Sequence, residues 1–311
     1  MSMTLLAVVV ALVLGHVAPA LVASARRFSW YGHWLQWLDR SFADGGIWHG
    51  RYGILLALVP PLLLVALLQW SFDARLLGLL SLLFGIAVLV YSWGPRDLDI
   101  DVEAIIDAHE PAARREAIAR LQPASTLAPA AVDEPMEARS LDALLDPPLV
   151  EAVFVNAMRR WFGVLWWFLL LGPFGALLYR LAALAANDRF ASLLPAQALA
   201  GARVLHALLD WPVAQLMALS MALVGNFDPV FNAWRGAGGN KLQLELGFLG
   251  AVARASVNSE LAEEAQEYAE EGMVQAMPEL PELRDAMSLV WRILLLWLAL
   301  LALFVIAGWV S

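Results

Sequence analysis

Residues 150–181 read VEAVFVNAMRRWFGVLWWFLLLGPFGALLYRL, and this stretch decides the fold. It begins with an amphipathic run that includes Glu151, and its part 161–178 is apolar and uncharged. A helix rises about 1.5 Å per residue, so roughly 20 apolar residues cross the hydrocarbon of a bilayer. The pattern predicts a transmembrane helix over 161–178, which is followed by Tyr179 and Arg180.

A Gly-Pro pair at 172–173 makes a break in this helix the alternative. If the helix is continuous, Glu151 and Arg180 lie near opposite membrane faces, roughly 40 Å apart at about 1.5 Å per residue. If the helix breaks at the pair and the chain turns back, the two residues can share a site. Whether the chain reverses at Gly172 therefore decides whether Glu151 and Arg180 can belong to one site.

The composition indicates a membrane protein with several spans. Hydrophobic residues make up 61% of the chain, charged residues 16%, and the mean hydropathy is +0.66. Soluble domains carry roughly 25% charged residues. The chain has no cysteine, which excludes disulfides, thiolate nucleophiles and Cys-liganded metals. A net charge of −9, with Lys241 the only lysine, argues against a nucleic-acid partner.

Further apolar segments lie on both sides of the central stretch. We expect an all-α, polytopic integral membrane protein with about five or six hydrophobic helices. The segment 204–225 contains Asp210-Trp211-Pro212, so it is either a span interrupted near its start or a re-entrant interfacial helix. The tryptophans of 26–52 recur at helical spacing and predict an amphipathic helix at the membrane interface. The other apolar segments are 4–25, 53–70, 76–93 and 293–310.

Two polar, partly helical regions separate the apolar segments. The first covers 94–160 and includes an Ala- and Pro-rich linker over 121–149, and the second covers 226–286. The arginine distribution in the loops predicts that both regions face the cytoplasm. We treat 1–311 as a single membrane domain with these two cytoplasmic regions. No metal site is expected, because the acidic residues near position 99 lack the glycine and distal glutamate of a calcium loop.

Two short motifs follow the central stretch in the second half of the chain. Residues 208–214 read LLDWPVA, and an asparagine-led segment with glycines covers 240–250. With the central stretch, they resemble the membrane family that joins AmpE, a modulator linked to β-lactamase induction, to the cobinamide-phosphate synthases CobD and CbiB. The matching positions of the central stretch are Val150, Glu151, Asn156, Gly163, Gly172, Gly175, Ala176, Tyr179 and Arg180.

The departures from the synthases favour the AmpE branch. The Gly-Arg-Asp-Thr motif of the synthases has no counterpart in 121–149, and their Asn-Thr-Leu-Asp box is replaced by Ala-Leu-Ala-Ala at 183–186. Polar groups that the synthases use for amide formation are therefore missing. The resemblance implies an inner-membrane regulator or sensor of the β-lactam and cell-wall-recycling response in a bacterium.

We expect a non-enzymatic modulator without catalytic residues, metal or cofactor. Its expected partners are the lipid bilayer and a cell-wall fragment or a protein, and a homo-oligomer is left open. The alternative is a synthase-like enzyme of cobalamin biosynthesis, in which Arg180 would hold an anionic group. A transporter is the third hypothesis, based on His206 and Asp210 in an apolar segment. The candidate ligand-binding residues are Glu151, Asn156, Tyr179, Arg180, Asp210 and Asn240.

Overall fold

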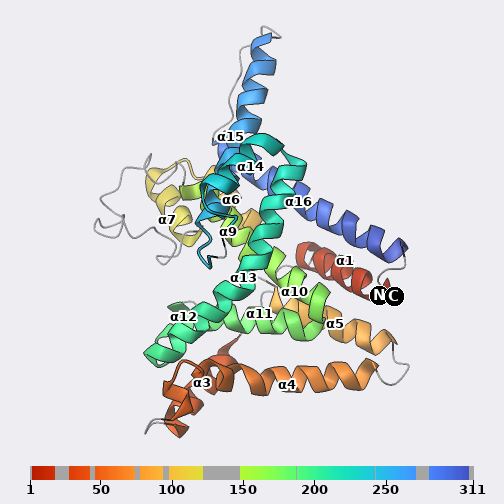
Figure 1. Cartoon of the computed structure of the whole chain (residues 1–311), viewed down its shortest axis with the longest axis vertical. Helices are drawn as coiled ribbons and strands as arrows, with labels where there is room; N and C mark the ends of the chain where they lie inside the picture. The colour runs from red at the N-terminus through yellow and green to blue at the C-terminus, as the bar shows by residue number, and fades with distance from the viewer. Residues whose placement is uncertain are drawn as a thin grey trace. The chain divides into compact units, whose positions relative to one another are not determined.

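The computed structural model describes residues 2–17, 28–42, 46–73, 78–93, 98–121, 148–186, 188–241, 243–270 and 280–307. Every regular element within these ranges is a helix (Figure 1), which confirms the expected all-α class. The chain divides into two compact units. The first comprises Met1–Pro95, Arg159–Asp210 and Leu300–Ser311, and the second comprises Arg96–Met158 and Trp211–Ala299.

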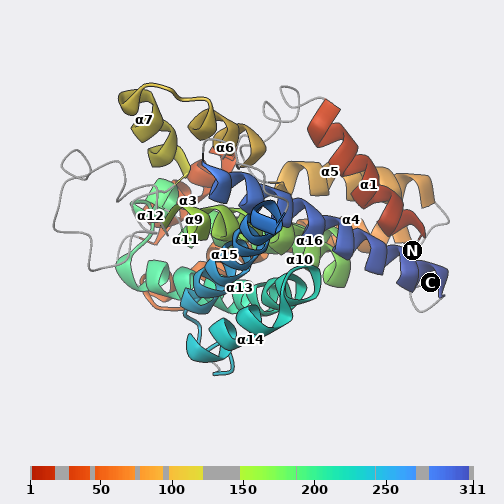
Figure 2. The same cartoon turned by 90° about the horizontal axis from the view of Figure 1, so that it is seen from above.

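The first unit is a bundle of apolar helices. Helices α4 and α5 pack against each other and against α11, α10 packs against α11 and α5, and α1 packs against α5 (Figures 1 and 2). Helix α3 and the 3-10 turn η1 contact α4, and the short α12 follows α11. Their bounds are α1 Ser2–Val17, α3 Ser29–Ser41, η1 Ile47–His49, α4 Gly53–Asp73, α5 Gly78–Ser92, α10 Gly163–Leu171, α11 Pro173–Ala186 and α12 Asp188–Ala191.

Reversal of the chain at Gly172 makes the expected single helix over 161–178 wrong. Gly172 has a φ of +67°, a backbone conformation that favours glycine, and its N–H donates to the carbonyl of Phe168 over 2.8 Å. Pro173 then occupies the first position of α11, where its missing N–H costs no helical hydrogen bond. Helices α10 and α11 therefore form an antiparallel hairpin.

The tip of this hairpin is capped by a side chain from α4. The amide nitrogen of Gln69 donates to the carbonyl of Leu171 over 3.3 Å, and the amide oxygen accepts from the N–H of Phe174 over 3.2 Å. Gly175 lies so close to the carbonyl of Trp167 that a Cβ there would overlap it. One glutamine thus satisfies two backbone groups that the reversal removes from helical hydrogen bonding.

A second side chain repairs the backbone inside α4. Pro60 and Pro61 lie within this helix, and Pro61 has no N–H to donate to the carbonyl of Ala57, four residues earlier. The indole nitrogen of Trp34 donates to that carbonyl over 3.1 Å. Trp34 lies on α3, which confirms the helix predicted within 26–52. Its aromatic face therefore has a structural role in addition to any contact with lipid.

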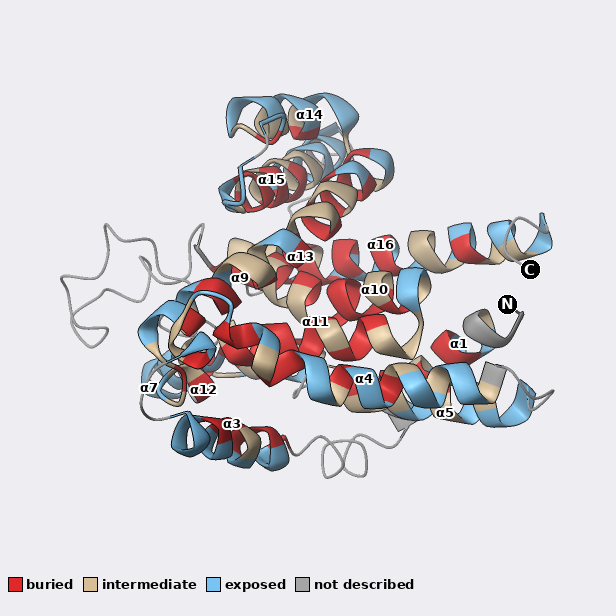
Figure 3. Cartoon of the chain, turned by 60° about the horizontal axis from the view of Figure 1, so that its bottom comes forward, coloured by how far each residue is buried: buried red, intermediate tan, exposed pale blue. Residues whose placement is uncertain are grey.

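Buried residues of the first unit concentrate on α11 (Figure 3). Ten of its residues are buried, including Tyr179 and Arg180, whereas one face of α4 is exposed and carries large apolar side chains. Water is a poor solvent for such a face, which is what a helix in contact with lipid presents. Helix α11 is therefore the centre of the bundle.

The second unit is built around α9 and α15. Helix α9 packs against α6, α7 and α15, and α14 packs against α15. The bounds of these helices are α6 Leu98–Ile106, α7 Pro111–Leu121, α9 Pro148–Ala157, α14 Phe227–Gly236 and α15 Gly247–Glu270. Of the expected linker 121–149, residues 122–147 lie outside the described residues.

Two long helices contribute residues to both units. They are α13, Ala196–Val224, and α16, Pro281–Ile306. Helix α13 continues through Pro212, so the expected interruption within 204–225 is wrong. By length and composition, three helical segments of the described chain can cross a membrane: Gly53–Phe72, Ala196–Val224 and Pro281–Ile306. Shorter apolar helices cover Leu5–Leu14, Gly78–Ser92 and Pro173–Ala186.

Replacing Gln69 by alanine should destabilise the hairpin. The carbonyl of Leu171 and the N–H of Phe174 lose their partner, and each unsatisfied group away from water costs about 1–3 kcal/mol. Thermal unfolding of the detergent-purified protein should show a clear fall in Tm. Gln36→Ala, at an exposed position of α3, is the control and should leave Tm unchanged. Equal Tm values for the two variants would contradict the capping role.

The Trp34 hydrogen bond should be coupled to Pro61. Trp34→Phe leaves the carbonyl of Ala57 without a donor, whereas Pro61→Ala restores a backbone N–H at the helical position. In a double-mutant cycle, we expect Trp34→Phe to cost about 1 kcal/mol more with Pro61 present than in the Pro61→Ala background. Unfolding free energies measured in the same detergent test this, and additive effects would contradict it.

Candidate functional site

A buried polar cluster lies where α11 meets the N-terminal part of α13, within the first unit. The hydroxyl of Tyr179 on α11 donates to Oδ1 of Asp210 on α13 over 2.6 Å. Both residues are fully buried. A buried carboxylate is stable only with donors or positive charge around it. The structure thus brings together two of the residues that the sequence predicts for ligand binding.

Arg159 supplies the positive charge. Its Nε donates to Oδ2 of Asp210 over 3.3 Å, so the two carboxylate oxygens have different partners. Arg159 lies in a π-helical turn, η5 Met158–Phe162, which precedes α10, and such turns are frequent at functional sites. Its side chain is 32% exposed, whereas that of Asp210 is 1% exposed. Arg159 therefore connects the buried carboxylate to the surface.

His206 lies one helical turn before Asp210 on the same face of α13. Its Nε2 is 3.5 Å from Oδ1 of Asp210, which is long for a hydrogen bond, and its ring centre is 5.7 Å from that of Tyr179. The imidazole is buried, with 5% of its surface exposed. It therefore packs on the phenol and interacts electrostatically with the carboxylate.

Arg180 follows Tyr179 on α11 and is also buried. Its guanidinium carbon lies 5.7 Å from the ring centre of Phe28, a cation–π distance. Arg180 interacts electrostatically with Tyr179 and His206, as Arg159 does. Both guanidinium groups thus interact with the phenol and the imidazole, and that of Arg159 also pairs with the carboxylate. This positive charge offsets part of the cost of burying Asp210.

Helix α10 provides the space in which the cluster forms. A Cβ at Gly163 would overlap the ring of Tyr179, so the absence of a side chain there lets α11 approach α10 closely. One turn later, the indole nitrogen of Trp167 donates to the carbonyl of Leu209 over 3.1 Å. Gly163 and Trp167 therefore position Tyr179 and Asp210, respectively.

Glu151 has a partner of its own in the second unit. It lies on α9 and forms a salt bridge with Arg254 on α15. A Cβ at Gly250 would lie 2.6 Å from the carboxyl carbon of Glu151, so a glycine is needed for this packing. Its structural role is to join α9 to α15.

Asn156 and Asn240 also belong to the second unit. The amide of Asn156 donates to the carbonyls of Leu121 and Ala152, both over 2.8 Å, and so ties α9 to the end of α7. Asn240 is exposed in the turn that follows α14. The amide nitrogen of Asn156 therefore has a structural role, whereas Asn240 is open to solvent.

Arg159 was not singled out from the sequence, and His206 was considered for the transporter hypothesis but not among the ligand-binding candidates. His206 and Asp210 are four residues apart, which places them on one helical face, so the sequence did contain a signal for the histidine. Arg159 lies 51 residues before Asp210. Its role depends on how the hairpin and α13 pack, and no local pattern in the sequence indicates it.

The carboxylate of Asp210 is paired within the cluster on both of its oxygens. Asp210 accepts from Tyr179 on one oxygen and from Arg159 on the other, so each oxygen already has a donor within the protein. Within the described residues, no group of three His, Asp or Glu side chains has the arrangement of a metal site. The cluster can still respond to a ligand or partner that competes for Arg159, because that arginine is partly exposed.

Comparisons with known proteins give no match. No family model matches the chain, and neither a curated protein nor a solved structure matches it. The resemblance to AmpE and the cobinamide-phosphate synthases therefore stays a prediction based on short motifs.

Adding one methyl group at Gly163 should disturb the cluster. In Gly163→Ala, the new Cβ overlaps the ring of Tyr179, and overpacking of this kind costs about 1–3 kcal/mol. Gly236→Ala is the matched control, because a Cβ at this position on α14 meets nothing within 4 Å. Thermal unfolding should show a lower Tm for Gly163→Ala alone. A Tm equal to that of the control would contradict the close approach of α10 and α11.

Proposed function

We propose that the protein is a regulatory membrane protein of the AmpE type, which modulates the response of a bacterium to β-lactams or to cell-wall recycling without catalysis. The observation that carries the proposal is the closed network of Arg159, Asp210 and Tyr179. Asp210 on α13 is paired with Arg159, which precedes the hairpin, and with Tyr179 on α11 of the hairpin. Such a network suits a switch between two packing arrangements.

The residues that carry the family resemblance support this proposal. Gly172 makes the reversal, Gly175 packs against α10, and Gly163 makes room for Tyr179. Tyr179 in turn bonds Asp210 of the LLDWPVA segment. These glycines, Tyr179 and Asp210 thus have connected structural roles in the first unit, whereas Glu151, Asn156 and the segment 240–250 belong to the second unit.

The membrane proposal is a multi-pass protein of the bacterial inner membrane with about five or six hydrophobic helices. The three long apolar segments are its first candidates, and the shorter helices α1, α5 and α11 supply the others. The short helices need neighbours, because each covers less than the roughly 30 Å of a bilayer core. We propose that the polar regions 94–160 and 226–286 face the cytoplasm, as the arginine distribution predicts.

Arg159 is the proposed input of the switch. A bound cell-wall fragment with a carboxylate, or an acidic segment of a protein partner, would compete with Asp210 for its guanidinium. The loss of this donor would leave a buried carboxylate supported by Tyr179, and repacking of α13 against the hairpin would relieve that cost. The binding energy would thus be converted into movement of a long helix.

A synthase-like enzyme is the alternative, and one observation favours it. The reversal at Gly172 brings Tyr179, Arg180 and Asp210 into one cluster, as an active site at this position would require. Against it, the two carboxylates that could act in catalysis, Glu151 and Asp210, are each paired with an arginine. A general base needs access to the proton that it takes.

The proposal predicts a signalling defect in Tyr179→Phe. The substitution keeps the ring and removes one donor from Asp210, which shifts the balance between the two arrangements. We expect a reporter strain that lacks its own AmpE to show altered β-lactamase induction with this variant and a wild-type response with Tyr52→Phe. Tyr52 is 71% exposed and serves as the control. Wild-type induction by Tyr179→Phe, at equal membrane abundance, would contradict the role of the cluster.

Thermal-shift measurements separate the modulator from the enzyme. A ligand at a hundredfold excess over its Kd stabilises a protein by about 2.7 kcal/mol. The panel is an anhydro-muropeptide, ATP with Mg²⁺, and a cobyric acid analogue. We expect no stabilisation by the nucleotide or the corrinoid. Stabilisation by either, with loss of the effect in Arg159→Gln and Arg180→Gln, would favour the enzyme and contradict the proposal.

A further inference from the structure

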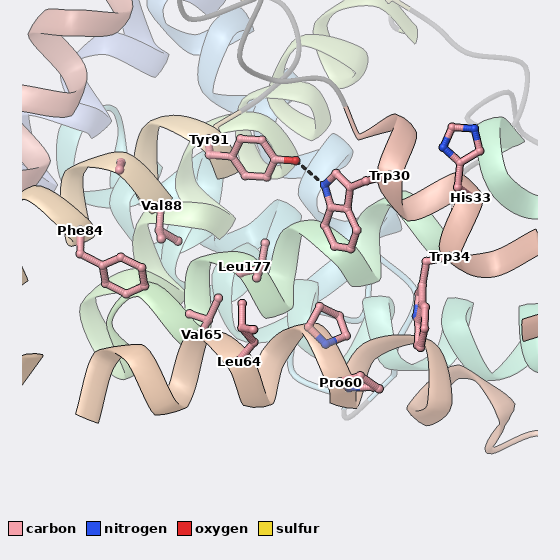
Figure 4. Close-up of a pocket in the computed structure, with 12 residues that line it drawn as sticks. Trp30, His33, Trp34, Pro60, Leu64, Val65, Phe84, Val88, Tyr91 and Leu177 are labelled. Atoms are coloured by element: carbon pink, nitrogen blue, oxygen red, sulfur yellow. Dashed lines mark hydrogen bonds between the residues drawn. The ribbon is translucent and has the colours of Figure 1, made fainter. Parts of the chain in front are cut away.

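A groove of about 890 Å³ opens on the first unit. None of the residues that line it belongs to the Asp210 cluster. Figure 4 looks into it. Val65 and Leu64 of α4 lie opposite Phe84 and Val88 of α5, and Leu177 of α11 lies behind them. Residues of α3 line the same groove. Its volume is within the range of roughly 300–1,000 Å³ that is usual for ligand sites.

The two indole nitrogens on the groove wall are already bonded within the protein. The indole nitrogen of Trp30 donates to the hydroxyl of Tyr91 over 2.5 Å (Figure 4), and that of Trp34 donates to the carbonyl of Ala57. Pro60 and Pro61 offer no N–H. The wall therefore presents mainly carbon atoms to an occupant. The exposed His33 of α3 also lines the groove, at the same end as Trp30 and Trp34 (Figure 4).

The groove is continuous with an apolar surface of α4. Leu64 lines the groove and is 62% exposed, and its neighbours Leu63 and Leu67 are 56% and 62% exposed. These residues belong to a segment that is long and apolar enough to cross a membrane. A lipid next to α4 can therefore enter the groove sideways, without passing through water.

We propose that this groove binds one acyl chain of a bilayer phospholipid, with the headgroup at the α3 end near His33. The chain would bury the carbon-lined wall, which gains free energy in proportion to the apolar area that is covered. The headgroup would lie beside Trp30 and Trp34, residue types that are typical of the depth at which headgroups meet the hydrocarbon. The proposal is independent of the regulatory function, because it involves none of the residues of the Asp210 cluster.

Photolabelling in reconstituted bilayers tests the proposal on the full chain. The probe is a phospholipid with a photoreactive group on one acyl chain, and labelled peptides are mapped by mass spectrometry. We expect enrichment on 60–65 and 84–91 over the exposed residues of α16, such as Leu295 and Leu303, which are apolar but do not line the groove. Equal labelling of α4, α5 and α16 would overturn the proposal.

Val88→Phe is designed to fill the groove. It should lower labelling there by about tenfold, the change that a loss of about 1.4 kcal/mol in binding gives. Val90→Phe is the matched control, since Val90 is equally half-buried on α5 but does not line the groove. Unchanged labelling in a folded Val88→Phe variant would overturn the proposal.

A second pair of variants carries little risk of misfolding. Leu64→Trp covers the groove from an exposed position, and Leu63→Trp changes the adjacent exposed leucine outside it. We expect reduced labelling for the first and wild-type labelling for the second. Equal labelling of the two variants would overturn the proposal. Displacement of the phospholipid probe by a polyprenyl phosphate present in trace amount would overturn its assignment to a phospholipid.

Discussion

The reversal at Gly172 is the constraint on which the structure of the first unit depends. In an apolar surrounding, a backbone group that leaves a helix must find another partner, because water cannot supply one. Gly172 adopts the positive φ, Pro173 has no N–H that would need an acceptor, and Gln69 bonds one group on each side of the reversal. Only with these features together can a helix turn back at this point.

The hairpin also explains how a charged cluster is tolerated beside apolar helices. Because the chain returns, Arg159 before α10 and Tyr179 on α11 reach the same carboxylate of Asp210. Burying that carboxylate alone would cost several kcal/mol, and pairing with a guanidinium offsets part of this cost. A continuous helix would have separated Arg159 from Tyr179 by roughly 30 Å at about 1.5 Å per residue.

Local repairs of the same kind recur in the unit. The indole nitrogen of Trp34 donates to the carbonyl of Ala57, which Pro61 cannot bond because it has no N–H. Gly163 and Gly175 lie where α10 and α11 approach too closely for a side chain. These features link the aromatic helix α3 to the groove between α4 and α5. The polar cluster and the apolar groove thus both lie in the helix bundle of the first unit.

The sequence by itself determined the helical class, the long apolar segments and the importance of Gly172, because composition and the Gly-Pro pair act locally. It also singled out Tyr179, Arg180 and Asp210. Only the tertiary structure decided that the helix reverses, that Arg159 joins these residues, and that Glu151 and Asn156 serve the packing of the second unit. The physical reason is that these contacts join segments up to 103 residues apart, and their energy depends on packing that no local pattern specifies.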